Sequence, residues 1–372
     1  MQVSRTRIWQ IPSNKIQKTA VKSRQIKMNV LASSIQRGFR HTRGDYKNKC
    51  GSRMSVQTDL GFGINLLDTG FQRPDMAACY VIQHTDANTG NRELAIIETG
   101  TKDTVPHLLN FLAQNNLPLE QVKYVVVTHV HLDHAGGAGL LMRALPNAKL
   151  VVHEKGARHM IDPSKLQAGA TAVYGKIEFN KTYGDLLPID ESQIIIPKDG
   201  EVLELAGRKL TFIDTPGHAR HHFCVFDELS QGFFTGDTFG LAYQELTNEN
   251  GPFIFPTTTP VQFDPDALHH SIDKMMAFKP QRMFLTHYSV VENPAPLSLR
   301  LHAQVNQLVA IAESATQPAG PARVQEIFSA IMEMLLAGLE KHGCELPLEK
   351  QKLVVQSDAF LNAQGLDIWL GK

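Results

Sequence analysis

The residues best suited to chemistry lie close together, in residues 128–137 of the chain. This segment contains His129, His131, Asp133 and His134, and imidazole and carboxylate groups are common ligands of transition metals. In an extended segment, residues two apart point to the same side, so His129 and His131 can reach one metal ion together. Asp133 and His134 follow at a turn, where they can face a second ion. The spacing therefore predicts a site for two adjacent metal ions.

The elements on either side of this segment are expected to position its side chains. Residues 124–128 are apolar and β-branched, which is typical of a buried strand. Residues 135–145 favour a helix, and Gly136 and Gly137 at its start leave room for another stretch of backbone. We therefore expect the candidate ligands at the junction of a buried strand and a helix.

Three more segments place a histidine or an aspartate directly after a strand-like run. His218 closes a Thr-Pro-Gly-His sequence that follows the run at 210–213. Asp237 lies in a Phe-Thr-Gly-Asp-Thr sequence, and His287 ends a Leu-Thr-His sequence. Strands alternate with helices along this part of the chain, which indicates an α/β layered core. Such a core could bring the three segments to one site.

Taken in order, these motifs resemble the signature of the metallo-β-lactamase superfamily, over about residues 60–290. Within it, the chain looks most similar to the glyoxalase-II-like and lactonase-like hydrolases. The resemblance implies an α/β fold, the αββα sandwich, for a catalytic domain at residues 54–293. It also implies two divalent metal ions, with zinc expected first and iron or manganese as alternatives. By position, the first ion would be held by His129, His131 and His218, the second by Asp133, His134 and His287, and both by Asp237.

Such a site implies metal-dependent hydrolysis. Two divalent cations close together lower the pKa of a bridging water, and the resulting hydroxide attacks a carbonyl carbon. Asp133 is expected to orient this hydroxide and to receive a proton as general base. The substrate would be a small molecule that carries an ester, thioester, lactone or amide group.

Three other functions remain as alternatives. Relatives of the same fold bind iron and oxidise sulfur compounds or carry electrons, but a set of seven ligands favours two metals. A nuclease of this fold would need basic surface for phosphate contacts, whereas residues 54–372 hold 24 basic and 36 acidic side chains. This acidic composition leads us to expect no nucleic-acid partner. The third alternative, a binding protein without catalysis, is disfavoured by the complete ligand set.

An aromatic stretch after Asp237 is expected to shape an apolar substrate pocket, although the same rings could instead pack against a helix at 265–278. Lactonases of this superfamily have a tyrosine three residues after the bridging aspartate, where this chain has Gly240. The basic glutathione-binding positions of glyoxalase II are not recognisable either. Both departures count against these two narrower assignments. The predicted substrate contacts are Phe239, Tyr243, Phe255 and Tyr288.

Four further polar residues are compared with the predicted ligands for a supporting role. Glu98 stands where the superfamily usually has an aspartate, which implies altered hydrogen bonding around the ligands. Asp214 fits equally well as a partner of a ligand histidine and as a turn residue at the end of a strand. His221 and His222 are interpreted as turn or strand residues rather than as pocket residues.

The two ends of the chain differ from the central part. Residues 1–53 hold 13 Lys and Arg side chains and one acidic residue, and they are interpreted as a disordered or targeting extension outside the fold. A basic arm that binds nucleic acid is a further alternative for this segment. Residues 294–372 carry apolar residues at helical spacing. They predict a helical region that packs on the main domain or on a partner, which could be a second copy in a homodimer.

The composition also indicates a compartment. No run of about 18 apolar residues is present, so no membrane partner is expected. The four cysteines show no paired spacing, which indicates free thiols in a reducing environment. We expect a cytoplasmic protein, or a mitochondrial one if residues 1–53 are a transit peptide.

Overall fold

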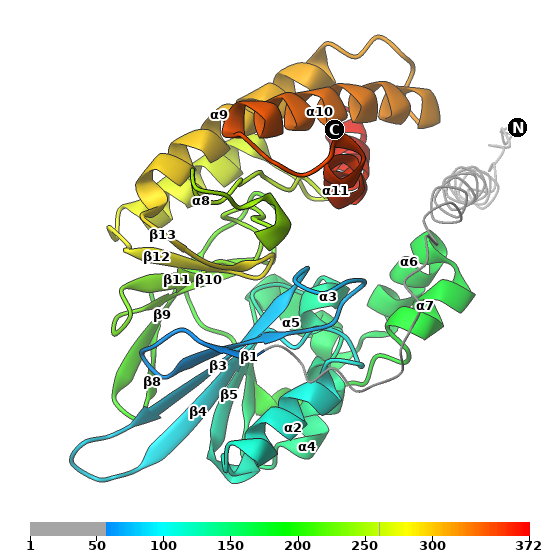
Figure 1. Ribbon diagram of the computed structural model, residues 1–372. Coiled ribbons are helices and arrows are strands. Elements are labelled where there is room, and N and C mark those ends of the chain that lie inside the picture. Colours follow the sequence, from blue (N-terminus) through cyan, green and yellow to red (C-terminus); the bar gives the residue numbers. More distant parts are fainter. Residues whose placement is uncertain (1–56, 260) are drawn as a thin grey trace, which may run out of the picture.

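The computed structural model describes residues 57–259 and 261–372. In this part of the chain, two β-sheets face each other, and helices cover the outer face of each sheet (Figure 1). The expected αββα sandwich is therefore confirmed. The interpretation of residues 1–53 as an extension falls outside the described residues.

The first sheet has seven strands in sequence order. Its first four strands are antiparallel, and the last four, beginning with β4, pair in parallel. The strands are β1 (Gln57–Asp59), β2 (Ile64–Asp68), β3 (Ala78–Thr85), β4 (Arg92–Ile97), β5 (Val122–Val126), β6 (Lys149–Val151) and β7 (Ile194–Ile195).

The second sheet has six strands, again in sequence order from β8 to β13. Only β11 and β12 pair in parallel, and the other neighbours are antiparallel. As a result, β9, β11 and β12 run in the same direction and end at the same edge. The strands are β8 (Val202–Leu205), β9 (Arg208–Asp214), β10 (Phe223–Asp227), β11 (Gly232–Phe234), β12 (Arg282–Leu285) and β13 (Ser289–Glu292).

Most of the helices form the two outer layers (Figure 1). Those of the first layer are α2 (Val105–Gln114), α3 (Leu132–Ala135), α4 (Ala138–Ala144) and α5 (Glu154–Ile161). Helices α6 (Ser164–Tyr174) and α7 (Lys176–Thr182) lie to one side of this layer, at the right of Figure 1. Those of the second layer are α8 (Pro265–Met276), α9 (Pro294–Glu313), α10 (Pro321–His342) and α11 (Leu348–Trp369).

Three apolar clusters hold these layers together. The central cluster lies between the sheets, where Tyr80 of the first sheet meets Phe234 and Phe284 of the second, with ring centroids 5.2 and 5.8 Å apart. A second cluster joins the first sheet to α2–α5, and a third joins the second sheet to α8–α11. Burial of apolar surface stabilises a fold by roughly 25 cal/mol per Å². The edge where the strands end is thereby fixed on a rigid frame.

The segment that carries four candidate ligands departs slightly from its expected elements. Strand β5 ends at Val126, two residues before the end of the expected strand 124–128, because Thr128 donates its backbone N–H and its hydroxyl to the Glu98 carboxylate instead of to a neighbouring strand. The helix expected at 135–145 is divided into α3 and α4. Close backbone approach at Gly137 is confirmed, since a Cβ there would lie 2.7 Å from the Thr99 carbonyl oxygen.

The helix expected at 265–278 is present as α8, which ends at Met276. Asp264 caps its start, where Asp264 Oδ1 accepts the Ala267 N–H at 3.1 Å. Helix α2 likewise begins with a proline in its first turn, and residues 161–200 contain α6 and α7.

The C-terminal residues form three long helices, α9–α11, that share one core with the second sheet. Val305, Leu335 and Leu366 belong to the same cluster as Phe233 and Met283. The division of the chain after residue 293 stays a prediction, as does a homodimer. Within the described ranges, none of the helices has the length and apolar character needed to cross a bilayer.

Candidate metal centre

The seven candidate ligands follow the carboxyl ends of four strands. Residues 129–134 come after β5, and His218 follows β9. Asp237 follows β11, and His287 follows β12. The structure therefore brings all seven predicted residues into two adjoining groups, and within each group the ligand atoms lie within 4.8 Å of one another.

The first half-site, as we name it, consists of His129, His131, His218 and Asp237. His131 Nδ1 lies 2.8 Å from His129 Nε2 and 3.1 Å from His218 Nε2. Asp237 Oδ2 lies 3.2 Å from His218 Nε2. Three ring nitrogens and one carboxylate oxygen thus converge on one point, which is the donor set of a transition-metal site.

The second half-site consists of Asp133, His134 and His287. Asp133 Oδ2 lies 3.4 Å from His287 Nε2 and 3.7 Å from His134 Nε2. Its carboxylate is 25% exposed, whereas the side chains of His134 and His287 are buried. Asp133 is therefore the group of this half-site that solvent reaches most readily.

Asp237 joins the two half-sites. Its Oδ2 faces the first half-site, whereas its Oδ1 lies 3.2 Å from His134 Nε2 and 3.6 Å from His287 Nε2. His134 Nε2 and Asp237 Oδ1 are buried without a hydrogen-bond partner among the described residues. An unsatisfied buried polar atom costs about 1–3 kcal/mol, and a bound cation would satisfy both atoms. The residues present therefore fit a divalent metal site, and their individual roles as ligands stay predictions.

Glu98 supports ligands of both half-sites from the end of β4. Its fully buried carboxylate lies 3.1 Å from His134 Nδ1 and accepts a hydrogen bond from the Thr128 hydroxyl. The Thr128 oxygen is then free to accept from His129 Nδ1, 3.1 Å away. With Nδ1 protonated, each ring directs an Nε2 lone pair into the cluster. Glu98 therefore contacts His134 directly and His129 through Thr128, and whether glutamate alters this bonding relative to the usual aspartate stays a prediction.

Backbone groups orient two more ligands. His287 Nδ1 donates to the Met76 carbonyl oxygen at 2.7 Å. His218 hydrogen-bonds to the Thr257 backbone, and the Thr259 hydroxyl lies 3.4 Å from its ring nitrogens. Sequence analysis missed these partners because a backbone acceptor leaves no signal in residue type.

The electrostatic environments of the half-sites differ. Burial, together with neighbouring imidazoles, lowers the pKa of His129, His131 and His218 below the ordinary range of histidine. Burial also opposes the charged forms of His134 and His287, but neighbouring carboxylates outweigh it and raise the pKa of both rings. Without metal, the first half-site is therefore neutral at its histidines, whereas the second holds protons.

Three neighbouring polar residues do not contribute ligand atoms to the two groups. His222 Nε2 accepts the Asp237 N–H at 3.2 Å, and its Nδ1 lies 3.0 Å from Thr215 Oγ1, so this buried ring fixes the backbone at Asp237. Asp214 lies 3.0 Å from His153 Nε2, which is outside the candidate ligand set. His221 packs against His129 with ring centroids 6.2 Å apart.

The predicted substrate contacts are buried side chains. Phe239, Tyr243 and Phe255 have no exposed surface, and Tyr288 is 5% exposed. The Tyr243 hydroxyl donates to Asp358 Oδ2 at 3.1 Å. The role of these four residues in substrate binding stays a prediction.

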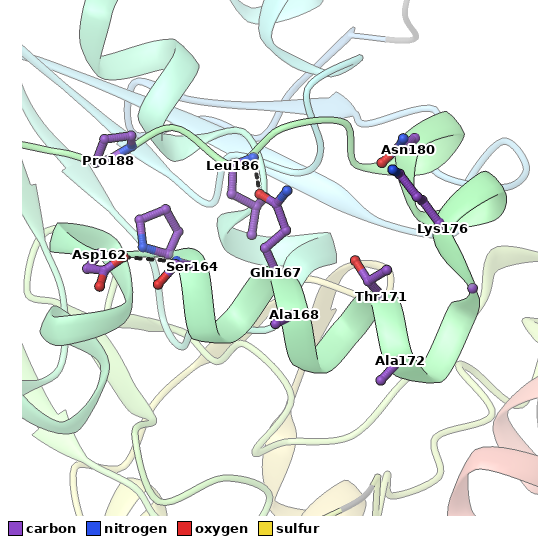
Figure 2. Close-up of a pocket in the computed structure, with 12 residues that line it drawn as sticks. Asp162, Ser164, Gln167, Ala168, Thr171, Ala172, Lys176, Asn180, Leu186 and Pro188 are labelled. Carbon is purple, nitrogen blue, oxygen red and sulfur yellow. Dashed lines mark hydrogen bonds between the residues drawn. The ribbon is translucent and has the colours of Figure 1, made fainter. Parts of the chain in front are cut away.

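A pocket of about 880 Å³ lies away from the metal cluster, between α6, α7 and residues 186–188 (Figure 2). None of the seven candidate ligands lines it. Two polar groups of its wall are already paired, since Gln167 Oε1 accepts the Leu186 N–H and Asp162 Oδ1 accepts the Ser164 N–H. The pocket is therefore a feature of the fold separate from the two half-sites.

Comparison with known proteins agrees with this geometry. The family model for the metallo-beta-lactamase superfamily matches residues 73–287, more than half of the chain. A metallo-beta-lactamase fold-containing protein, ST1585 from Sulfurisphaera tokodaii, is 28% identical over 222 residues, which are 59% of this chain and 75% of that protein. The crystal structure of ST1585 matches with a TM-score of 0.52 and 25% identity, covering 75% of this chain and 98% of that one.

Two further relatives match shorter segments. An atrochrysone carboxyl ACP thioesterase from Aspergillus fumigatus is 29% identical over 118 residues, 32% of this chain and 28% of that protein. A hydroxyacylglutathione hydrolase from Francisella tularensis subsp. novicida is 29% identical over 128 residues, 34% of this chain and 37% of that protein. The chain thus spans about a third of the length of these two relatives. On the extent of the family model and the ordered motifs, the chain belongs to the metallo-β-lactamase superfamily.

Proposed function

We propose that this protein is a metal-dependent hydrolase that attacks a carbonyl substrate: an ester, thioester, lactone or amide. The observation that carries the proposal is the position of Asp237, whose two oxygens face different half-sites. Two bound divalent cations would lower the pKa of a water and polarise a carbonyl oxygen. Zinc is the first candidate because five of the seven ligands are imidazoles, and iron or manganese are alternatives.

The chain's own residues would orient the reactants. Burial opposes ionisation of Asp133, but His134 and His287 hold its pKa below the ordinary range of aspartate. Asp133 is therefore ionised at neutral pH and can accept a hydrogen bond from the attacking water. A carboxylate with such a low pKa is a weak base, so Asp133 is better suited to orient the water than to keep the proton that the water releases. Asp237 has its pKa lowered as well, against the effect of burial, by His134 and His218.

Among the four substrate classes, we favour a thioester. The Aspergillus fumigatus relative is named a thioesterase, and its match covers 118 residues. The metal cluster itself is compatible with all four classes, since each presents a carbonyl carbon to a nucleophile and an oxygen to a cation. Thioesters are therefore the first substrates to assay.

The test is elemental analysis combined with a substrate panel. The full chain would be loaded separately with zinc, manganese and iron, and assayed on thioesters, esters, lactones and amides. We expect two metal ions per chain and hydrolysis of at least one class. A folded protein with two bound ions that cleaves none of them contradicts the proposal. One iron per chain with oxygen consumption on a persulfide would instead establish the redox alternative.

A further inference from the structure

Helix α11 buries polar side chains against the segments that support the metal ligands. Asn362 is 2% exposed and Asp358 is 9% exposed. The two residues lie four positions apart, so they share one face of the helix. Buried polar groups as a rule have hydrogen-bond partners, and the partners of these two residues lie in the loops that follow β11.

Asn362 holds the segment 256–259. Its Oδ1 accepts the Thr258 N–H at 2.7 Å, its Nδ2 donates to the Pro256 carbonyl oxygen at 3.1 Å, and its backbone oxygen accepts the Thr258 hydroxyl at 3.1 Å. This segment contains Thr259, whose hydroxyl lies 3.4 Å from the ring nitrogens of His218. Asn362 is thus one residue removed from a partner of the first half-site.

The backbone of α11 also touches this segment directly. A Cβ atom at Gly365 would lie 1.5 Å from the Thr258 carbonyl oxygen. Such a contact is impossible for any side chain, so the helix and the segment can approach this closely only with glycine at the position. Gly365 follows Asn362 by one helical turn and lies on the same face. Helix α11 and the segment are therefore in direct backbone contact at this position.

Asp358 reaches the second half-site in a similar way. It accepts the Tyr243 hydroxyl at 3.1 Å. The preceding residue, Ala242, donates its N–H to the His287 carbonyl oxygen at 2.6 Å. Asp358 is thus connected to His287 through one tyrosine side chain and one backbone hydrogen bond.

We infer that α11 is part of the frame of the metal centre, with Asn362 as a positioning residue for His218 and Asp358 as a positioning residue for His287. The inference rests on the proposed function, because it assumes that the two half-sites bind metal. Helix α11 would then orient His218 and His287 through hydrogen bonds, in addition to packing against the second sheet. Partners that orient ligands typically change metal affinity about 10–100-fold when removed.

The test measures zinc affinity of the full-length protein by competition with a chromophoric chelator. Asp133→Ala leaves only the first half-site complete, and His131→Ala leaves only the second. In the first background, Asn362→Ala is expected to weaken zinc binding about 10-fold or more. In the second background, Asp358→Ala is expected to weaken it, whereas Asp358→Asn, which keeps an acceptor for Tyr243, restores it.

Gln351 supplies the matched control. It is 8% exposed on the same helix, and its Nε2 donates to the Leu346 carbonyl oxygen at 2.7 Å, away from both half-sites. Gln351→Ala is expected to leave both zinc affinities unchanged. Equal losses in Gln351→Ala and Asn362→Ala would overturn the inference, since a general loss of stability would then explain both.

The remaining outcomes separate this inference from the proposed function. If the wild-type protein binds no zinc, the proposed function fails. If it binds zinc and folded Asn362→Ala binds it equally well, only the role of α11 fails. Should Asn362→Ala not fold, Thr258→Val removes a single hydroxyl contact to the helix. That variant is expected to weaken the first half-site severalfold, and unchanged affinity would overturn the inference.

Discussion

The two half-sites share Asp237 but differ in how they hold charge. In the first, burial and mutual repulsion keep His129, His131 and His218 neutral. In the second, carboxylates raise the pKa of both histidines, so protons occupy the place of a cation. A cation can enter the first half-site without displacing a proton, whereas it must compete with protons in the second.

The partners that orient the ligands follow the same division. The first half-site is supported by neutral groups, such as the Thr128 hydroxyl and the Thr257 backbone. The second is supported by the buried carboxylate of Glu98, 3.1 Å from His134. Two adjacent candidate cation sites thus differ in the groups that orient their ligands, and the contribution of each set of groups can be tested separately.

The largest effect is expected when the shared ligand is removed. Asp237→Ala takes one oxygen from each half-site and leaves His134 Nε2 without its nearest carboxylate. We expect the rate of hydrolysis to fall at least about 1,000-fold, which is more than the loss caused by removing one hydrogen-bond donor to a reacting oxygen. We also expect fewer than two metal ions per chain. Elemental analysis and the substrate assay measure both. A variant that keeps two ions would contradict the role of Asp237 as a shared ligand.

The next effect concerns pH. Because His134 and His287 have raised pKa values without metal, a cation that enters the second half-site displaces protons, and its affinity falls as the pH falls through those values. The loss is about tenfold per pH unit for each proton displaced. The first half-site should change little over the same range, because its histidines are already neutral.

Zinc competition titrations between about pH 6 and pH 8 would measure this difference, with Asp133→Ala and His131→Ala isolating each half-site. Affinity should fall with acidification in the His131→Ala protein and stay nearly constant in the Asp133→Ala protein. Parallel losses in the two proteins would show that the contrast in charge does not govern metal binding.

A smaller effect is expected from Glu98→Gln. The amide keeps the shape of the side chain but removes the charge that orients His134, so the second ion should bind about 10–100-fold more weakly. The first ion should lose less, because only the Thr128 hydroxyl connects Glu98 to His129. Zinc affinities, measured for each half-site in the Asp133→Ala and His131→Ala backgrounds, give the loss of affinity at each half-site.

Asp214→Asn is the matched control for this substitution. Its carboxylate lies 3.0 Å from His153 Nε2, so it also pairs with a histidine, but outside the cluster. It should leave both affinities unchanged. If Glu98→Gln weakened the two half-sites equally, Glu98 would support the fold of the edge rather than one ligand.

The half-sites also differ in how far the sequence could predict them. His129, His131, Asp133 and His134 form one local motif, where spacing alone places the side chains on a common turn. The other three ligands, at the ends of β9, β11 and β12, could be identified only through ordered motifs that resemble a known family. Their meeting depends on the packing of two sheets, which local spacing does not determine.

The supports of the site were largely beyond sequence reasoning. Thr258 and Asn362 are separated by 104 positions, and neither belongs to a recognisable motif. The bounds of α11 do not follow from apolar spacing alone, because the polar residues Gln351, Asp358 and Asn362 lie on its buried face. Strand β5 ends earlier than its composition predicts because Thr128 bonds to a side chain. Each discrepancy arises where a polar contact distant in sequence overrides a local pattern.

The smallest expected effect concerns Asp358, on the side of the second half-site. Burial raises its pKa from 3.8 to about 6, although His287 and the Tyr243 hydroxyl oppose the shift. A carboxyl group with a raised pKa contributes stability that is complete below the unfolded pKa and is lost as the pH rises through the folded value. The metal-free protein should therefore lose about 2 kcal/mol from this group between about pH 4 and pH 7.

Asp358→Asn removes this dependence while keeping an acceptor for Tyr243. Urea unfolding of the metal-free proteins should show similar stability of variant and wild type near about pH 4, and greater stability of the variant near about pH 8. If the difference in unfolding free energy between the two proteins were the same at both pH values, the pKa of Asp358 would not be raised by burial. The difference in charge between the histidines of the two half-sites would then be confined to the ligands and would not extend to Asp358 in α11.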